Sequence, residues 1–349
     1  MLFVTIFVFI FILSLIMICH EYGHYLGAKI THVPVRQFGI GFFKPILKWK
    51  RKETQFSINI LPLGAFVDVL GLDNPKEKKK EAYWNQSVNK RFIIASFGVL
   101  FNLLLAWIFL TFSLWLFALL PSKHFVIIQE VKPQSAAETA GLKAGDIIVA
   151  GNGQNFPTAE EVTQFTKAHR NEIVTLKIKH NGKEVEKKIQ LGSDTEAPLG
   201  IAMTDSGFEE KIPFYQAPIT ALKTLGQATY TTFAYLGRLI ISPFIKEKVP
   251  LAVSGPVGIY GIIAQFTEVG LVYLLRIAAF FSLGIGIFNL IPLPALDGAR
   301  MIFLMLEKIF GRKVIKPEVE NTLHSVGFVF LIALMLLVTY NDIVGLIRK

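Results

Sequence analysis

The residues HEYGH at 20–24 have the types and spacing of half a metal site. On a helix, positions i and i+4 share one face, so His20 and His24 can present two imidazole nitrogens to one ion. A catalytic zinc takes three protein ligands and keeps one position for water, and a neighbouring carboxylate such as Glu21 can act as general base. The pattern predicts a hydrolytic zinc site whose third ligand lies elsewhere in the chain.

An apolar run from Met1 to Cys19 leads directly into this motif. The run has no basic leader and no small-residue cleavage site, so we expect a retained transmembrane helix rather than a removable signal peptide. Ionisable side chains are costly inside a membrane and are retained there for function. This cost favours a metal site over the alternative interpretation, a structural His-Glu-His patch that binds no metal.

The whole chain is too apolar for an ordinary soluble protein, because 52% of its 349 residues are hydrophobic and only 18% are charged. The mean hydropathy is +0.49. Three further runs, at about 92–120, 271–291 and 323–346, are long enough to cross about 30 Å of hydrocarbon. We therefore expect a polytopic α-helical membrane protein with about four transmembrane helices.

The net charge of +10 is concentrated in short segments. Basic residues at 44–52 and 76–80 lie between the first two spans, and the basic segment 307–316 lies between the last two. The positive-inside rule places these loops in the cytoplasm, and the long segment 121–270 on the other side of the inner (cytoplasmic) membrane. Basic runs of this kind contact the headgroups of the lipid bilayer. Nucleic acid is not an expected partner, because the chain carries no recognition motif for it.

The N-terminal membrane part, 1–120, contains one segment with a strand-like pattern. Residues 54–69 alternate partly between apolar and polar side chains and are interrupted by Pro62 and Gly64. The pattern predicts a membrane-associated β-hairpin or bent strand, and a plain surface loop is the alternative. Non-helical backbone at membrane depth is tolerated only where protein or a wet cavity surrounds it, so we expect this element near HEYGH.

The segment 123–192 has the composition of a small inserted α+β domain. The Asn181-Gly182 dipeptide between two alternating runs predicts a β-hairpin. Thr158, with a glutamate three residues later, forms a capping box at the start of a predicted helix, 158–169.

Two regions follow this domain. Residues 213–260 combine amphipathic helices, expected on the membrane surface, with an SGPVGI loop at 254–259. The C-terminal membrane part, 270–349, holds the last two spans.

A third zinc ligand is offered by Asp297, in the segment FNLIPLPALDG at 288–298. Pro292 and Pro294 prevent a regular helix from continuing, and the Asp-Gly pair favours a turn that can bend the acid back into the bilayer. Asn289 lies just before the break, where its amide can bond a substrate carbonyl or the oxyanion formed on attack. The alternatives are a helix N-cap for Asp297 and capping of freed backbone groups for Asn289.

Several motifs in this order resemble the bacterial site-2 protease family of intramembrane zinc metalloproteases, of the regulator-of-sigma-E-protease type. They are HEYGHYLGA, FGIGF, LPLGAFV, GLKAGD, SGPVGI and NLIPLPALDG, and they cover nearly the whole chain. The resemblance implies that His20, His24 and Asp297 bind Zn²⁺ and that Glu21 is the general base.

The resemblance also assigns roles outside the metal site. It implies that the domain at 123–192 is a PDZ-like domain, and that the element around 54–69, with Gly64 and Phe66, engages substrate together with Asn289. One departure from the family pattern is Gly284, which stands where many members carry a second asparagine.

The expected function is that of a zinc metalloendopeptidase that cleaves transmembrane segments, such as those of anti-sigma factors or remnant signal peptides, in regulated intramembrane proteolysis. Its expected partners are transmembrane-helix substrates, the lipid bilayer and an upstream site-1-type protease. Two other interpretations are an inactive scaffold that binds partners through its PDZ-like domain, and a metal transporter. The complete set of ligands and base argues against a scaffold, and the concentration of ionisable residues at one site argues against a transporter.

Overall fold

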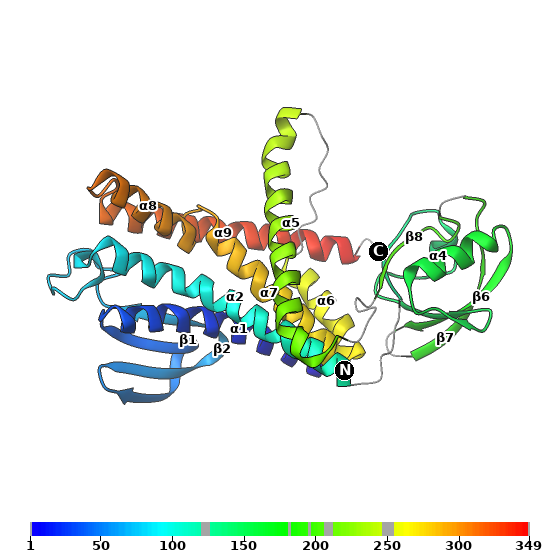
Figure 1. Ribbon diagram of the computed structural model, residues 1–349, viewed down its shortest axis with the longest axis horizontal. Coiled ribbons are helices and arrows are strands. Elements are labelled where there is room, and N and C mark those ends of the chain that lie inside the picture. The colour runs from blue at the N-terminus through cyan, green and yellow to red at the C-terminus, as the bar shows by residue number, and fades with distance from the viewer. Residues whose placement is uncertain are drawn as a thin grey trace. The chain divides into compact units, whose positions relative to one another are not determined.

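The apolar runs form the long helices of the protein. The computed structural model describes residues 2–119, 126–180, 183–194, 197–205, 212–245 and 255–347 (Figure 1). Each of the four predicted spans is a helix, and the first helix continues past Cys19, so that HEYGH lies inside it. Within the described residues, the helices long and apolar enough to cross a membrane are α1 (Leu2–Ile30), α2 (Val88–Leu119), α7 (Leu271–Leu290) and α9 (Pro317–Ile347).

The chain divides into two compact units. The helical unit comprises Met1–Ser113, Pro218–Ala264 and Tyr273–Lys349. The sheet unit comprises Leu114–Ala217 and Gln265–Val272. Each unit has its own buried clusters of apolar side chains.

In the helical unit, two long antiparallel strands, β1 (Val35–Arg51) and β2 (Thr54–Val69), lie beside α1 (Figure 1). The bent strand predicted for 54–69 is confirmed as β2, because its two halves, 55–58 and 65–69, both pair with the first half of β1. The basic stretch at 44–52, which its charge predicts to be a loop, is mostly strand because pairing with β2 satisfies its backbone. Ser14 of α1 donates a hydrogen bond to Pro62 O (2.7 Å), which fixes β2 on the helix.

Helices α1 and α2 approach each other closely because α1 has a glycine, Gly23, where it faces α2. Any side chain at Gly23 would overlap the backbone of Phe97 on α2. Helix α7 joins this pair where Ser282 Oγ donates to Asn102 O of α2 (2.8 Å). A short 3-10 helix, η1 (Tyr83–Asn85), precedes α2. The HEYGH residues are therefore held against α2.

A break after α7 leads into α8 (Asp297–Phe310). The prolines interrupt the helix as predicted. Within the break, Ala295 adopts a left-handed φ of 81°, and its N–H donates to His324 Nδ1 of α9 (3.2 Å). Gly298 lies so close to the last carbonyls of α7 that a side chain would overlap them. These contacts fix where α8 begins.

The region 213–260 is more helical than its sequence predicts. A short 3-10 helix, η2 (Phe214–Gln216), precedes one long helix, α5 (Ala217–Ile245), which is not among the candidate spans of the described residues. Helix α6 (Pro256–Val269) begins inside the SGPVGI segment, where we expect a loop. A proline fits the first helical position because its missing N–H would have no intrahelical partner there.

The sheet unit contains a six-stranded sheet in the order β7-β6-β4-β3-β8, with β5 paired to β4 and all neighbours antiparallel. The domain extends further than the predicted 123–192, because β8 follows residue 192. Its elements are β3 (Val126–Val131), α3 (Ala136–Thr139), β4 (Ile147–Gly151), β5 (Gln154–Asn155), α4 (Ala159–Ala168), β6 (Ile173–His180), β7 (Lys183–Gln190) and β8 (Ile201–Asp205).

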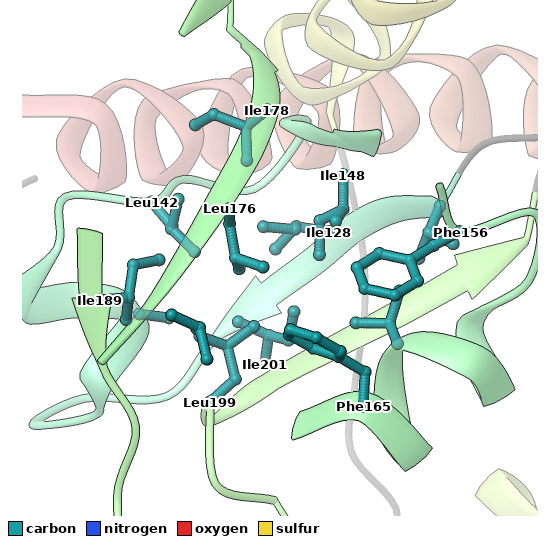
Figure 2. Packing of buried hydrophobic residues seen from close by; sticks show 14 of the residues in the cluster. Ile128, Leu142, Ile148, Phe156, Phe165, Leu176, Ile178, Ile189, Leu199 and Ile201 are labelled. Atoms are coloured by element: carbon teal, nitrogen blue, oxygen red, sulfur yellow. The ribbon is translucent and has the colours of Figure 1, made fainter. Parts of the chain in front are cut away.

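Local signals in the sheet unit are largely confirmed. The Thr158 hydroxyl caps α4 by accepting a hydrogen bond from the Glu161 N–H (3.3 Å). Strands β6 and β7 form the predicted hairpin, and its turn, 181–182, lies outside the described residues. Apolar side chains from the strands and α4 fill one core, in which Figure 2 labels Ile128, Ile148, Phe165 and Leu176 among others.

Candidate metal centre

The structure brings together the three residues that the sequence proposes as zinc ligands. On α1, the Nε2 atoms of His20 and His24 are 3.2 Å apart. Asp297, the first residue of α8, places its Oδ2 3.1 Å from His20 Nε2 and 3.3 Å from His24 Nε2. The N-cap position of α8 belongs to Leu296, which makes no side-chain cap, so the N-cap alternative for Asp297 is excluded.

The spacing of these donor atoms suits zinc. Two ligands that bind a tetrahedral Zn²⁺ at about 2.0–2.1 Å lie roughly 3.3 Å from each other, close to the observed separations. Apart from the two imidazoles, Asp297 Oδ2 is buried without a partner in the part of the chain that the structure describes. A buried carboxylate oxygen is costly unless a cation or a donor compensates for its lost hydration.

The other nitrogen of each imidazole determines which nitrogen is free for the metal. His24 Nδ1 lies 2.8 Å from Ile94 O and donates to it, which leaves the Nε2 lone pair free. His20 Nδ1 lies 3.3 Å from the Asn102 amide, whose Oδ1 has no partner among the described residues. Because the two ends of an amide are assigned from hydrogen bonding, we place Asn102 Oδ1 as the acceptor of the His20 Nδ1–H.

Two residues of α2 that matter here are not found by sequence reasoning. Asn102 is fully buried (0% exposed) within an apolar span. A polar residue in the middle of an apolar span indicates a functional role, so the sequence does offer a signal for Asn102. Gly98 lies against the imidazoles of His20 and His24, which any side chain there would overlap. A glycine in an apolar helix carries no comparable local signal.

A cavity of about 170 Å³ lies beside His24 and Asp297. Glu21 lines it, so the predicted base shares this space with two of the ligands. The cavity has room for several waters, each of which takes about 30 Å³ in the liquid. The Val67 backbone lies within hydrogen-bonding reach of the Glu21 carboxylate. The other lining residues are Val67, Val69, Leu72, Tyr83, Ile94, Ala95 and Arg300.

The three residues predicted to bind substrate are not among the described residues that line this cavity. Asn289 Nδ2 donates to the Ile285 carbonyl of its own helix (3.0 Å). Gly64 has a φ of 79°, and a Cβ there would lie 3.1 Å from the Phe42 ring. The Phe66 ring covers Gly39 of β1. Their part in substrate binding stays a prediction.

Comparison with known proteins agrees with this geometry. Residues 8–334 match peptidase family M50. The chain is 31% identical to a protein of Clostridium acetobutylicum named as a zinc metalloprotease, over 95% of both chains. It is also 31% identical to a protein of Helicobacter pylori named as a zinc metalloprotease, over 97% of this chain and 99% of that one.

A third relative is the regulator of sigma-W protease RasP of Bacillus subtilis, which is 27% identical over 97% of this chain and 98% of its own. The family match includes all three candidate ligand positions and most of the helical unit. Members of this family depend on zinc, so zinc is the cofactor. The chain therefore belongs to peptidase family M50, the site-2 protease family, and is a multi-pass membrane metalloprotease.

Proposed function

We propose that this metalloprotease cleaves transmembrane segments of membrane proteins within the bilayer. The observation that carries the proposal is the meeting of three ligands, His20, His24 and Asp297, beside Glu21. Two of the ligands and Glu21 lie on a helix that is apolar enough to span a membrane. Anti-sigma factors and remnant signal peptides are the substrates we propose, and the name of the B. subtilis relative supports the first.

Each residue of the site has a part in hydrolysis. His20, His24 and Asp297 would hold zinc, which supplies a Lewis acid for the scissile carbonyl and lowers the pKa of a water to about 7. Glu21 takes the proton that water gives up as its oxygen bonds to the carbonyl carbon, whose π electrons move to the carbonyl oxygen. When the C–N bond breaks, Glu21 returns the proton to the leaving nitrogen.

A helical substrate must unwind locally before its peptide bonds can react, because helical hydrogen bonds engage them. Val67 and Val69 of β2 line the cavity beside His24, so an extended peptide paired with β2 would pass the metal ligands. Gly64 and Phe66 precede these residues on the same strand. Proline at either position is expected to reduce cleavage at unchanged zinc content, and unchanged turnover would rule out this mode of binding.

The sheet unit is the part that we assign to a PDZ-like domain on the extracytoplasmic side of the inner membrane. The basic segments 44–52, 76–80 and 307–316 support this orientation through the positive-inside rule. Such a domain can bind the new carboxy terminus left by an upstream site-1-type protease, or limit the size of the substrates that reach the membrane.

Cleavage of a transmembrane reporter by the purified full-length protein tests the proposal. We expect cleavage that a chelator stops, that added zinc restores, and that Glu21→Gln abolishes while zinc stays bound. Glu53→Gln, the same change at the exposed turn between β1 and β2, is the matched control and should cleave normally. A wild-type protein that binds zinc without cleaving would instead favour the scaffold.

A further inference from the structure

Two polar residues that the mechanism does not use, Tyr83 and Arg300, line the cavity that Glu21 and Asp297 also line. Tyr83 begins η1, and its N–H donates to Leu70 O just after β2 (2.8 Å). Arg300 lies three residues after Asp297 on α8, so these two side chains share a helix face. Two separate elements therefore place hydrogen-bond donors at the wall of the same cavity.

Both donors have unused hydrogen-bonding capacity. Tyr83 is fully buried (0% exposed), yet its hydroxyl makes no hydrogen bond within the described residues. Burial raises the pKa of Tyr83 to about 12, so the phenol keeps its proton. Arg300 Nε lies 3.4 Å from Glu320 Oε1 of α9 without completing a hydrogen bond. A buried donor without an acceptor is costly unless a ligand or a water supplies one.

Surrounding charges hold this pair of donors in place. The Arg300 guanidinium carbon lies 5.7 Å from the centre of the Tyr83 ring. Arg91 of α2, which is buried, forms an ion pair with Glu307 of α8 (2.5 Å). Together with the approach of Glu320 to Arg300, this pair joins α2, α8 and α9 around the cavity. Donors fixed in this way need no reorganisation when charge develops beside them.

We propose that Tyr83 Oη and the Arg300 guanidinium donate hydrogen bonds to the oxygen of the scissile carbonyl, which becomes negatively charged when water adds to the carbonyl carbon. The inference rests on the proposed function and names the groups that bind the reacting carbonyl. That charge develops in the cavity where Glu21 takes the proton. Asn289, expected from the sequence to fill this role, is not among the described residues that line this cavity.

Tyr83→Phe tests the role of the hydroxyl, because it removes one oxygen atom and leaves the ring. In zinc-loaded, full-length protein in detergent micelles, we expect kcat on a transmembrane reporter to fall about 100-fold, with KM changed less than about twofold. Affinity for a peptide phosphinate, which mimics the tetrahedral transition state, should fall at least about tenfold by calorimetry. The unfolding temperature should not fall, because the hydroxyl has no partner to lose. Unchanged kcat and unchanged phosphinate affinity would overturn the proposal.

Two further sets of variants keep the test decisive. Tyr340→Phe makes the same change at an exposed tyrosine of α9 and should leave kcat and phosphinate affinity unchanged. Arg300→Lys keeps the charge but not the planar fork, so it should retain more kcat than Arg300→Gln. If the lysine and glutamine variants instead kept normal kcat, or lost it only together with folding, Arg300 would have no part in binding the carbonyl.

Wild-type protein separates failure of this inference from failure of the proposed function. If wild type cleaves, Glu21→Gln does not, and Tyr83→Phe and Arg300→Gln cleave normally, only the inference is wrong. If zinc-loaded wild type neither cleaves the reporter nor binds the phosphinate, the proposed function is wrong and the inference falls with it.

Discussion

The sheet unit and the helical unit differ in how they use buried polar groups. In the sheet unit, Asp146 accepts from the Lys143 N–H (3.0 Å) and pairs with His180 (2.5 Å). Among the described residues, every buried side-chain polar atom without a hydrogen-bond partner belongs to the helical unit. These atoms lie on Asn59, Tyr83, Arg91, Asn102, Thr111, Asp297, Arg300, Glu320 and His324.

The difference shows which unit is built around a ligand. Unpaired buried polar atoms are few in folded proteins, and those that remain call for an ion, a water or a reacting group. Here Asn102 contacts the imidazole of a candidate ligand, Asp297 is itself a candidate ligand, and Tyr83 and Arg300 line the adjacent cavity. The sheet unit instead is stabilised by a continuous apolar core (Figure 2).

The largest effect is expected at the metal ligands. His24→Ala removes one of three ligands, so zinc affinity and cleavage should fall by more than the roughly 10–100-fold that loss of a supporting residue costs. Zinc content and reporter cleavage of the full-length protein measure this. His169→Ala in the sheet unit is the control and should keep both. Full zinc content in His24→Ala would contradict the assignment of the site.

A smaller effect, confined to the other unit, is expected for Leu176→Ala. Leu176 is fully buried in the sheet core, and its truncation should destabilise the domain by about 2–5 kcal/mol. Hydrogen exchange of the full-length protein should show lost protection in β4 and β6 at unchanged zinc content. Ile173→Ala, at an exposed position of β6 (66% exposed), should cost less than about 0.5 kcal/mol. Loss of zinc from Leu176→Ala would contradict the prediction that the sheet core and the metal site are independent.

The smallest effect is expected for Asn102→Ala, which removes the acceptor that we assign to His20 Nδ1–H. Zinc affinity should fall about 10–100-fold, measured by competition with a chelator. Asn102→Asp supplies a carboxylate acceptor and should retain most of the affinity. Ser96→Ala, on the same helix, should leave it unchanged, because the Ser96 hydroxyl donates to Ile93 O of its own helix. A weaker site in Asn102→Asp than in Asn102→Ala would mean that Asn102 donates to His20.

Much of this architecture can be predicted from local sequence. Helical periodicity puts His20 and His24 on one face, and two prolines make the break that lets Asp297 turn toward them. Long apolar runs locate the spans, since hydrocarbon thickness sets their length. The capping threonine of α4, Thr158, can be read from a four-residue pattern.

What local sequence does not predict depends on contacts between distant segments. Strand β1 is missed because its lysines and Pro45 are not typical of a strand. It forms by pairing with β2. Strand β8 is missed because it is short and joins β3 across the sheet. Tyr83 and Arg300 meet at one cavity only after α8 packs against the segment before α2. The sequence pattern of neither segment predicts that these two side chains lie close together.

The most direct test of the account is the zinc X-ray absorption spectrum of the full-length protein. Binding by His20, His24 and Asp297 predicts two imidazole nitrogens, together with oxygen ligands, at about 2.0–2.2 Å. Cys19, the only cysteine, lies next to the motif, and zinc-sulfur bonds are about 2.3 Å long. A sulfur ligand at that distance, or a spectrum without imidazole, would contradict the assignment of the metal centre.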